Sequence, residues 1–154
     1  MTTAPILRSA HVRRPIDEAF TLFTEQIGAW WPLSTHGVFG DRAGGLDFVD
    51  GELVERSCDG QSTTWGEVVA WDPPCRLAMT WHPGRAADDA SMVEVSFTAD
   101  VDGTRVEIRH DGWEAFGEEA AARRRSYVGP NAWGYVLDFY CDLDEASEAV
   151  VANQ

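Results

Sequence analysis

The sequence predicts an α+β fold in which a curved antiparallel sheet of about six to seven strands wraps around one long C-terminal helix. Between residues 46 and 110, apolar and polar residues alternate in several segments separated by turn residues, a pattern typical of hairpin-linked strands. From residue 131 to about residue 148, apolar residues instead recur at steps of three and four, which indicates an amphipathic helix. Such a helix is ~27 Å long, which is close to the length of an eight-residue strand at ~3.3 Å per residue. The helix can therefore lie across the sheet.

The composition is that of one globular domain over residues 1–154, with 44% apolar and 25% charged residues. No apolar run approaches the ~20 residues that span a bilayer, and the N-terminus lacks a signal-peptide pattern, so we expect a cytoplasmic protein. The net charge of −14 argues against nucleic acid and anionic membrane surfaces as partners. Most of this acidic surface is expected to serve solubility.

No motif in the chain predicts a metal or a cofactor. The three cysteines are widely spaced and odd in number, so neither a disulfide framework nor a metal site is expected. The sequence also contains no phosphate-binding loop, nucleophile elbow or metal-ligand spacing. We therefore expect no cofactor.

The central segment, residues 65–82, predicts two strands joined by Asp72-Pro73-Pro74, because proline fixes φ and cannot donate to a strand ladder. In the strand before this connector, small residues occupy one set of alternate positions. In the strand after it, large apolar residues do so, and we expect both sets to lie on the same face of the sheet. Small side chains beside large ones would leave a hollow, although a packed core explains the same pattern equally well. We place on the inner face Gly66, Val68, Ala70, Leu77, Met79 and Trp81, and on the outer face Trp65 and Trp71.

The N-terminal part predicts a strand over residues 6–13, followed by a helix that begins near Pro15 and ends at Gly28. Residues 29–37, with Trp30-Trp31-Pro32, are expected to form a short helical turn or loop over one end of the sheet. Both tryptophans should be largely buried, because each carries a large apolar surface. His36, in the same segment, either caps a loop or stands as a polar group at the mouth of a pocket.

Glycine-containing turns divide the rest of the chain. Residues 37–46 are expected to be a loop, and Asp50-Gly51 predicts a two-residue turn within a hairpin over residues 46–56. Alternation places His110 on the inner face of the last strand, where a lone histidine is more often a hydrogen-bonded core residue than a catalyst. A helical piece is expected from residue 117 to about residue 127, with a break at Gly129-Pro130 before the long helix.

Several short segments of the chain together form a recognisable pattern. They are Trp30-Trp31-Pro32, Glu55 after the Asp50-Gly51 turn, Trp65-Gly-Glu-Val68, Trp71-Asp-Pro-Pro74, Arg76-Leu-Ala-Met-Thr-Trp81, Gly103-Thr-Arg-Val106, His110-Asp-Gly-Trp113 and Trp133-Gly-Tyr-Val-Leu137. Their order and spacing are fairly specific and cover nearly the whole chain. In them the chain resembles the START-like (SRPBCC) superfamily, and within it the small bacterial proteins similar to the C-terminal domain of the activator of Hsp90 ATPase.

The resemblance implies a helix-grip fold with a cavity between the sheet and the C-terminal helix. Across the superfamily this cavity is used for lipids, hormones, polyketides and other apolar molecules. The resemblance does not by itself imply a partnership with Hsp90. The candidate ligand-binding residues are Trp30, Trp31, His36, Leu77, Met79, Trp81, Val95, Phe97, Ile108, His110, Trp133, Val136 and Tyr140.

Three functions are compatible with such a chain, and binding of a small apolar or aromatic molecule without catalysis is the preferred one. In the first alternative, the protein is a cyclase, hydratase or isomerase in which His110 is the acid–base group and Glu55 or Tyr140 assists it. If Glu55 faces inward, it could pair with His110. In the second alternative, the outer tryptophans form an interaction surface for a chaperone partner or a homodimer.

Overall fold

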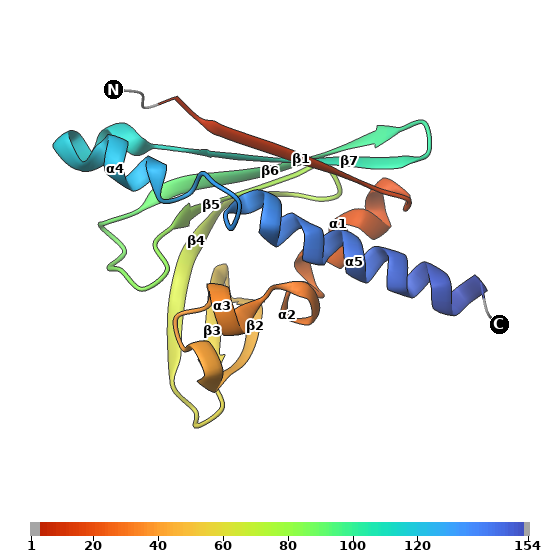
Figure 1. Ribbon diagram of the computed structural model, residues 1–154, viewed down its shortest axis with the longest axis horizontal. Helices are drawn as coiled ribbons and strands as arrows, with labels where there is room; N and C mark the ends of the chain where they lie inside the picture. Colours follow the sequence, from red (N-terminus) through yellow and green to blue (C-terminus); the bar gives the residue numbers. More distant parts are fainter. Residues whose placement is uncertain (1–3, 153–154) are drawn as a thin grey trace.

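Seven strands form one antiparallel sheet in the order β1-β7-β6-β5-β4-β3-β2, which confirms the predicted α+β architecture (Figure 1). The structure is a computed structural model that describes residues 4–152, with side chains described for residues 4–143. All neighbouring strands pair antiparallel, and the sheet curls into a half-barrel. The strands are β1 (Ile6–Val12), β2 (Ala43–Val49), β3 (Glu52–Ser57), β4 (Ser62–Asp72), β5 (Arg76–Trp81), β6 (Ser91–Asp100) and β7 (Gly103–Asp111).

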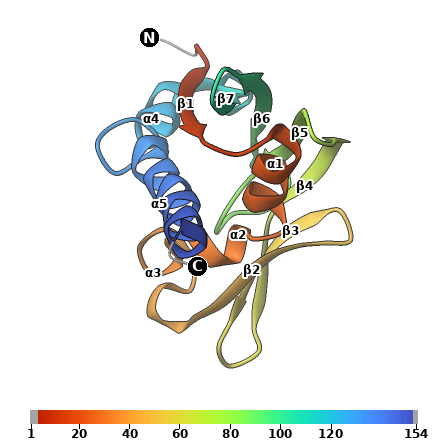
Figure 2. The ribbon, with the colours of Figure 1, turned by 90° about the vertical axis from the view of Figure 1, so that its right-hand side faces the viewer.

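Helices occupy the concave side of this sheet, as Figure 2 shows for α1 and α5. The hydroxyl of Tyr140 on α5 donates a hydrogen bond of 2.8 Å to the carbonyl of Ala19 on α1, and this bond joins the two helices. No helix among residues 4–152 has both the length and the apolar character needed to cross a membrane. The helices are α1 (Ile16–Thr24), α2 (Ile27–Trp30), α3 (Leu33–His36), α4 (Ala120–Arg125) and α5 (Trp133–Ala152), with 3-10 turns η1 (Gly40–Arg42) and η2 (Trp113–Glu119).

Several boundaries differ from the sequence-based prediction. The helical piece predicted over residues 117–127 is the turn η2 followed by α4, because Gly117 has the non-helical angles φ 55° and ψ −120°. The first helix ends at Thr24, and Gly28 lies inside α2, where a Cβ atom would stand 2.7 Å from the carbonyl oxygen of Leu46. Gly28 therefore allows α2 to lie against β2 and does not terminate α1. Strand β2 begins at Ala43, within the predicted loop, because its glycines pair with β3 through a shift in register.

Bulges in β4 overturn the prediction that Trp65 faces outward. Leu53 pairs with Gly66 while Val54 pairs with Thr64, so Trp65 is an extra residue in β4, and its side chain is buried. A Cβ atom on Gly66 would stand 1.8 Å from the carbonyl oxygen of Thr80, so only glycine fits at this close approach of two strands. Such an extra residue shifts every following side chain to the other face, which simple alternation cannot anticipate.

Aromatic side chains fill the middle of the concave face. Phe20 on α1 lies 5.1 Å from the ring of Phe97 on β6, and Phe23 lies 5.3 Å from the ring of Tyr140. Leu77 and Met79 are buried in the same core, as predicted. The sequence left open whether the inner face of the sheet is hollow or packed. In the middle of the sheet it is packed.

Candidate functional site

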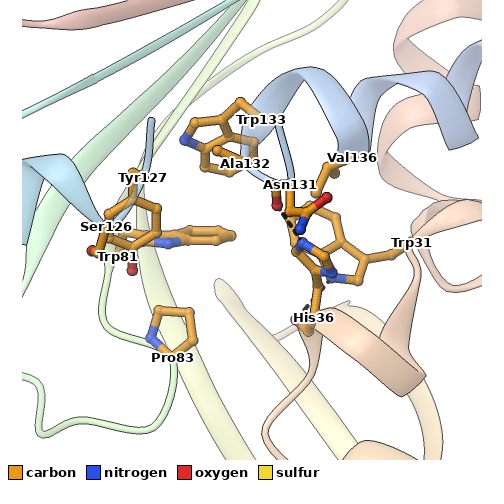
Figure 3. A pocket seen from close by; sticks show the side chains of 10 residues that line it. All are labelled: Trp31, His36, Trp81, Pro83, Ser126, Tyr127, Asn131, Ala132, Trp133 and Val136. Carbon is orange, nitrogen blue, oxygen red and sulfur yellow. Dashed lines mark hydrogen bonds between the residues drawn. The ribbon is translucent and has the colours of Figure 1, made fainter. Parts of the chain in front are cut away.

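A pocket of about 250 Å³ lies at one end of the sheet, where the end of β5 faces α3 and the first turn of α5 (Figure 3). Five of the residues predicted to bind a ligand line this pocket: Trp31, His36, Trp81, Trp133 and Val136. The loop over residues 126–132 closes another side. The remaining lining residues, which the sequence analysis did not single out, are Pro83, Ser126, Tyr127, Asn131 and Ala132.

The other predicted ligand-binding residues belong to the core and do not line this pocket. They are buried between the sheet and the helices, which agrees with their predicted inward direction. They are Trp30, Leu77, Met79, Val95, Phe97, Ile108, His110 and Tyr140. Alternation identifies inward side chains of strands, but it carries no information on loops. The break at Gly129-Pro130 was the one signal that a loop precedes α5 near the pocket.

Three indole rings form the apolar walls of the pocket. Trp31 follows α2, Trp81 ends β5 and Trp133 begins α5, so three distant parts of the chain each supply one ring. The ring centroids of Trp81 and Trp133 are 5.2 Å apart, and Trp31 lies 5.9 Å from Trp81 and 5.8 Å from Trp133. All three are buried, which confirms the predicted burial for Trp31. Such closely packed rings present a rigid surface to a flat apolar molecule.

His36 stands at the edge of the pocket and joins α3 to the chain that leads into α5. Its Nε2–H donates to the carbonyl oxygen of Asn131 at 2.7 Å, and its ring stacks on Tyr135 with the centroids 4.9 Å apart. The indole N–H of Trp31 in turn donates to the carbonyl of His36 at 3.2 Å. The sequence allowed two positions for His36, in a loop contact or at the mouth of a pocket. The structure combines them, because His36 holds the loop through its hydrogen bond to Asn131 and also lines the pocket.

Trp81 and Tyr127 supply the polar groups on the opposite side of the pocket (Figure 3). The indole nitrogen of Trp81 is buried and has no acceptor within 3.5 Å, the one such side-chain atom in the part of the chain described with side chains. Burial raises the pKa of the Tyr127 hydroxyl, and the neighbouring Trp81 N–H, Arg123 and Arg85 oppose this rise. The Tyr127 hydroxyl therefore keeps its proton at neutral pH.

His110 is fully enclosed away from the pocket, with both ring nitrogens engaged. The indole N–H of Trp133 donates to Nδ1 at 3.0 Å, so the ring proton lies on Nε2, which donates to the Ser91 hydroxyl at 2.7 Å. The Ser91 hydroxyl is 3.4 Å from the carbonyl oxygen of Trp81 and donates to it. Burial lowers the pKa of His110 to about 3, so the imidazole is neutral near pH 7.

Glu55 faces inward but is held far from any pairing with His110. Its carboxylate accepts hydrogen bonds from the backbone N–H of Val38 at 2.7 Å and of Phe39 at 3.1 Å. The indole N–H of Trp65 is a third donor, at 3.0 Å. The side chain is fully buried, so these three donors take the place of water around the carboxylate.

These contacts argue against the acid–base hypothesis. His110 and Glu55 do not meet each other, neither lines the pocket, and Tyr140 uses its hydroxyl to bind the carbonyl of Ala19. A general base must reach the proton that it removes, and His110 has no free lone pair toward the pocket. Among the side chains that the structure describes, no group of three His, Cys, Asp or Glu residues could hold a metal ion.

The predicted outer tryptophans do not form a pair. Trp65 is buried beside Trp31 and Trp81, with ring centroids 5.2 Å and 5.6 Å away. Trp71 is 43% exposed and packs its ring edge on Phe20 and Phe48. A second register shift in β4, between Val68 and Ala70, pairs Trp71 with the inward residue Leu77 and turns it toward Phe20 of α1. The prediction that Trp65 and Trp71 face outward is therefore wrong for both.

Comparison with known proteins places this architecture in a family. Residues 13–138 match the family model described as Activator of Hsp90 ATPase homolog 1-like protein. The chain belongs to this family. None of the curated proteins matches the chain.

Solved structures share the fold over nearly the whole length. The self-sacrificing resistance protein CalC from Micromonospora echinospora has a TM-score of 0.65 at 22% identity, covering 94% of this chain and 96% of CalC. An AHSA1-like protein from Aeromonas hydrophila has a TM-score of 0.60 at 21% identity, covering 94% of each chain. The anthrahydroquino-γ-pyrone synthase Txn09 has a TM-score of 0.57 at 29% identity, covering 92% of this chain and 99% of the synthase.

Proposed function

We propose that the protein binds a small, flat, largely apolar molecule in the pocket between Trp31, Trp81 and Trp133. The observation that carries the proposal is the meeting of three buried indole rings around an opening of about 250 Å³, next to a core that is otherwise filled by aromatic side chains. Pockets for drug-sized ligands occupy roughly 300–1,000 Å³. This one lies just below that range, so it suits a molecule of two or three fused rings.

The family relationship supports the same class of ligand. Small hydrophobic molecules are common ligands of this fold, and a similar structure is named as a synthase of an anthrahydroquino-γ-pyrone. We propose binding and not catalysis, because His110 and Glu55 are both engaged elsewhere in the core. The cytoplasmic location and the homodimer stay predictions.

Equilibrium dialysis with fluorene, a flat three-ring hydrocarbon, tests this proposal. We expect one fluorene to bind per chain. Replacing Ala132, which lines the pocket, by phenylalanine should place a ring in the opening and weaken binding by about tenfold or more, because packed interiors resist added volume. Fluorene can be measured by its own fluorescence, so the assay does not depend on the tryptophans.

The matched control is Ala115→Phe, the same substitution at an exposed position in η2 outside the pocket. This variant should bind fluorene as the unmodified chain does, and circular dichroism should show that both variants are folded. Equal binding by the Ala132→Phe variant, or no binding of fluorene to the unmodified chain up to its solubility, would refute the proposed function.

A further inference from the structure

The three indoles of the pocket differ in one respect: whether the N–H has an acceptor. The Trp31 N–H donates to the carbonyl of His36 at 3.2 Å, and the Trp133 N–H donates to Nδ1 of His110 at 3.0 Å. The Trp81 N–H has no acceptor within 3.5 Å, although Trp81 is only 4% exposed and the Tyr127 hydroxyl lies near enough for this N–H to lower its pKa. Buried donors are nearly always hydrogen-bonded, so an unpaired one in the wall of a pocket indicates a place for an acceptor.

Tyr127 adds a second polar group beside this donor. Its ring lies next to the Trp81 indole in the pocket wall, and it keeps its hydroxyl proton at neutral pH because burial disfavours the phenolate (Figure 3). A protonated phenol can donate a hydrogen bond as well as accept one. An oxygen atom on a ligand could therefore meet two donors on this side, whereas the rings of Trp31 and Trp133 face its apolar part.

The charges near the pocket favour a neutral acceptor over a carboxylate. Arg123 and Arg85, which lie near Tyr127, both pair with Asp89, at 2.9 Å and 3.0 Å. The two guanidinium groups share the one Asp89 carboxylate, and Glu119 lines the same hollow, so these four groups together carry no net charge. The chain as a whole carries a net charge of −14. A carbonyl oxygen accepts a hydrogen bond without bringing a charge into this apolar pocket.

We propose that the ligand is a flat aromatic ketone or quinone-like molecule whose carbonyl oxygen accepts a hydrogen bond from the Trp81 N–H. This inference rests on the proposed function and adds the chemical class of the ligand. Trp81 then sets specificity, because a pure hydrocarbon of the same shape would leave its N–H unpaired.

The test compares 9-fluorenone with fluorene, which share a three-ring shape and differ by one carbonyl oxygen. The quantity measured by equilibrium dialysis is the ratio of their two association constants, in the unmodified chain and in the Trp81→Phe variant. Phenylalanine keeps an apolar ring but has no N–H. We expect the ratio to fall by about 3–10-fold in the variant, the size typical of one buried hydrogen bond.

The matched control is Trp31→Phe, which changes a wall of the same pocket but removes an N–H that already has an acceptor. It should weaken binding of both compounds and leave their ratio as in the unmodified chain. Because each ratio compares two ligands in one protein, a general loss of packing cancels. A ratio that is the same with and without the Trp81 N–H would overturn the inference while leaving the proposed function intact.

Two further results separate the two proposals. If the unmodified chain binds no fluorene up to its solubility, the proposed function fails, and the inference that rests on it fails with it. If the Trp81→Phe variant does not fold, infrared difference spectra of fluorenone bound to the unmodified chain decide the matter. A carbonyl stretching band at lower wavenumber than in an alkane solvent supports the hydrogen bond, and an alkane-like band contradicts it.

Discussion

His110 joins three elements of the structure through hydrogen bonds to its ring. It lies on β7, accepts from Trp133 on α5 and donates to Ser91 on β6. Sequence alternation placed it inward, which is correct, and the role that the structure gives it is the structural one. The enclosure that makes this network rigid also makes a charged imidazole unfavourable, and stability should therefore depend on pH.

The sign of this dependence follows from the two pKa values of the imidazole. In the folded chain the pKa of His110 is lowered to about 3, from the ordinary 6.5 expected of the unfolded chain. Between these values the unfolded chain binds a proton that the folded chain does not, so the free energy of unfolding falls as pH falls from 6.5 toward 3. From pH 7 to pH 5 we expect this histidine to account for a loss of about 1–2 kcal/mol.

Urea unfolding at pH 7 and pH 5 measures this loss. In the His110→Asn variant, which cannot titrate, the drop between the two pH values should be smaller by about that amount, although the variant is less stable at both. The His11→Asn variant is the control, because His11 is exposed on β1. If the drop is equal in the His110→Asn variant and the unmodified chain, His110 does not carry the predicted dependence.

At the scale of elements, Glu55 fixes the segment between α3 and β2. The carboxylate sits on β3 and binds the backbone N–H groups of Val38 and Phe39, which have no strand partner. Gly37 lies against the same carboxylate, since a Cβ atom there would stand 2.7 Å from its Oε2 atom. One buried acid thereby holds the chain that begins at His36, at the edge of the pocket.

Replacing Glu55 by glutamine should loosen this segment. One carboxylate oxygen becomes an amide group that cannot accept a hydrogen bond, so one of the three donors loses its partner. We expect the free energy of unfolding to fall by about 1–3 kcal/mol. Amide hydrogen exchange at Val38 and Phe39 should become faster by a larger factor than exchange in β6.

Glu67→Gln provides the matched control, because Glu67 is exposed on the neighbouring strand β4. It should change neither the stability nor the exchange at residues 38 and 39. Unchanged exchange at both amides in the Glu55→Gln variant would contradict the role assigned to the buried carboxylate.

At the scale of the whole molecule, the sequence predicted the fold more fully than the site. Strands, turns and the C-terminal helix have local signals, such as the Asp50-Gly51 turn, whose residues have φ angles of 51° and 81°. The family resemblance added the expectation of a cavity between the sheet and the C-terminal helix. The bulge at Trp65 has no local signal, because it depends on the approach of Gly66 to the carbonyl of Thr80 across two strands.

The site was predicted only in part, for a related reason. Trp81 and Trp133 belong to regular elements whose periodicity shows which way they face, and both line the pocket. Tyr127 and Asn131 come from a loop, where no periodicity applies. Packing of α1 against the sheet, which no pattern in a single strand reveals, fills the middle of the concave face and leaves the pocket at its end.

The central claim is that a flat ligand binds between Trp31, Trp81 and Trp133. The indole N–H signals in nuclear magnetic resonance spectra test it most directly, because each of the seven tryptophans contributes one such signal. On addition of fluorenone, the Trp81 signal should shift most, and those of Trp31 and Trp133 should shift as well. The signal of Trp71, which pairs with Leu77 near the start of β5 whereas Trp81 ends that strand, should stay in place. A shift confined to Trp71, or no shift at Trp81 when fluorenone is bound, would contradict the account.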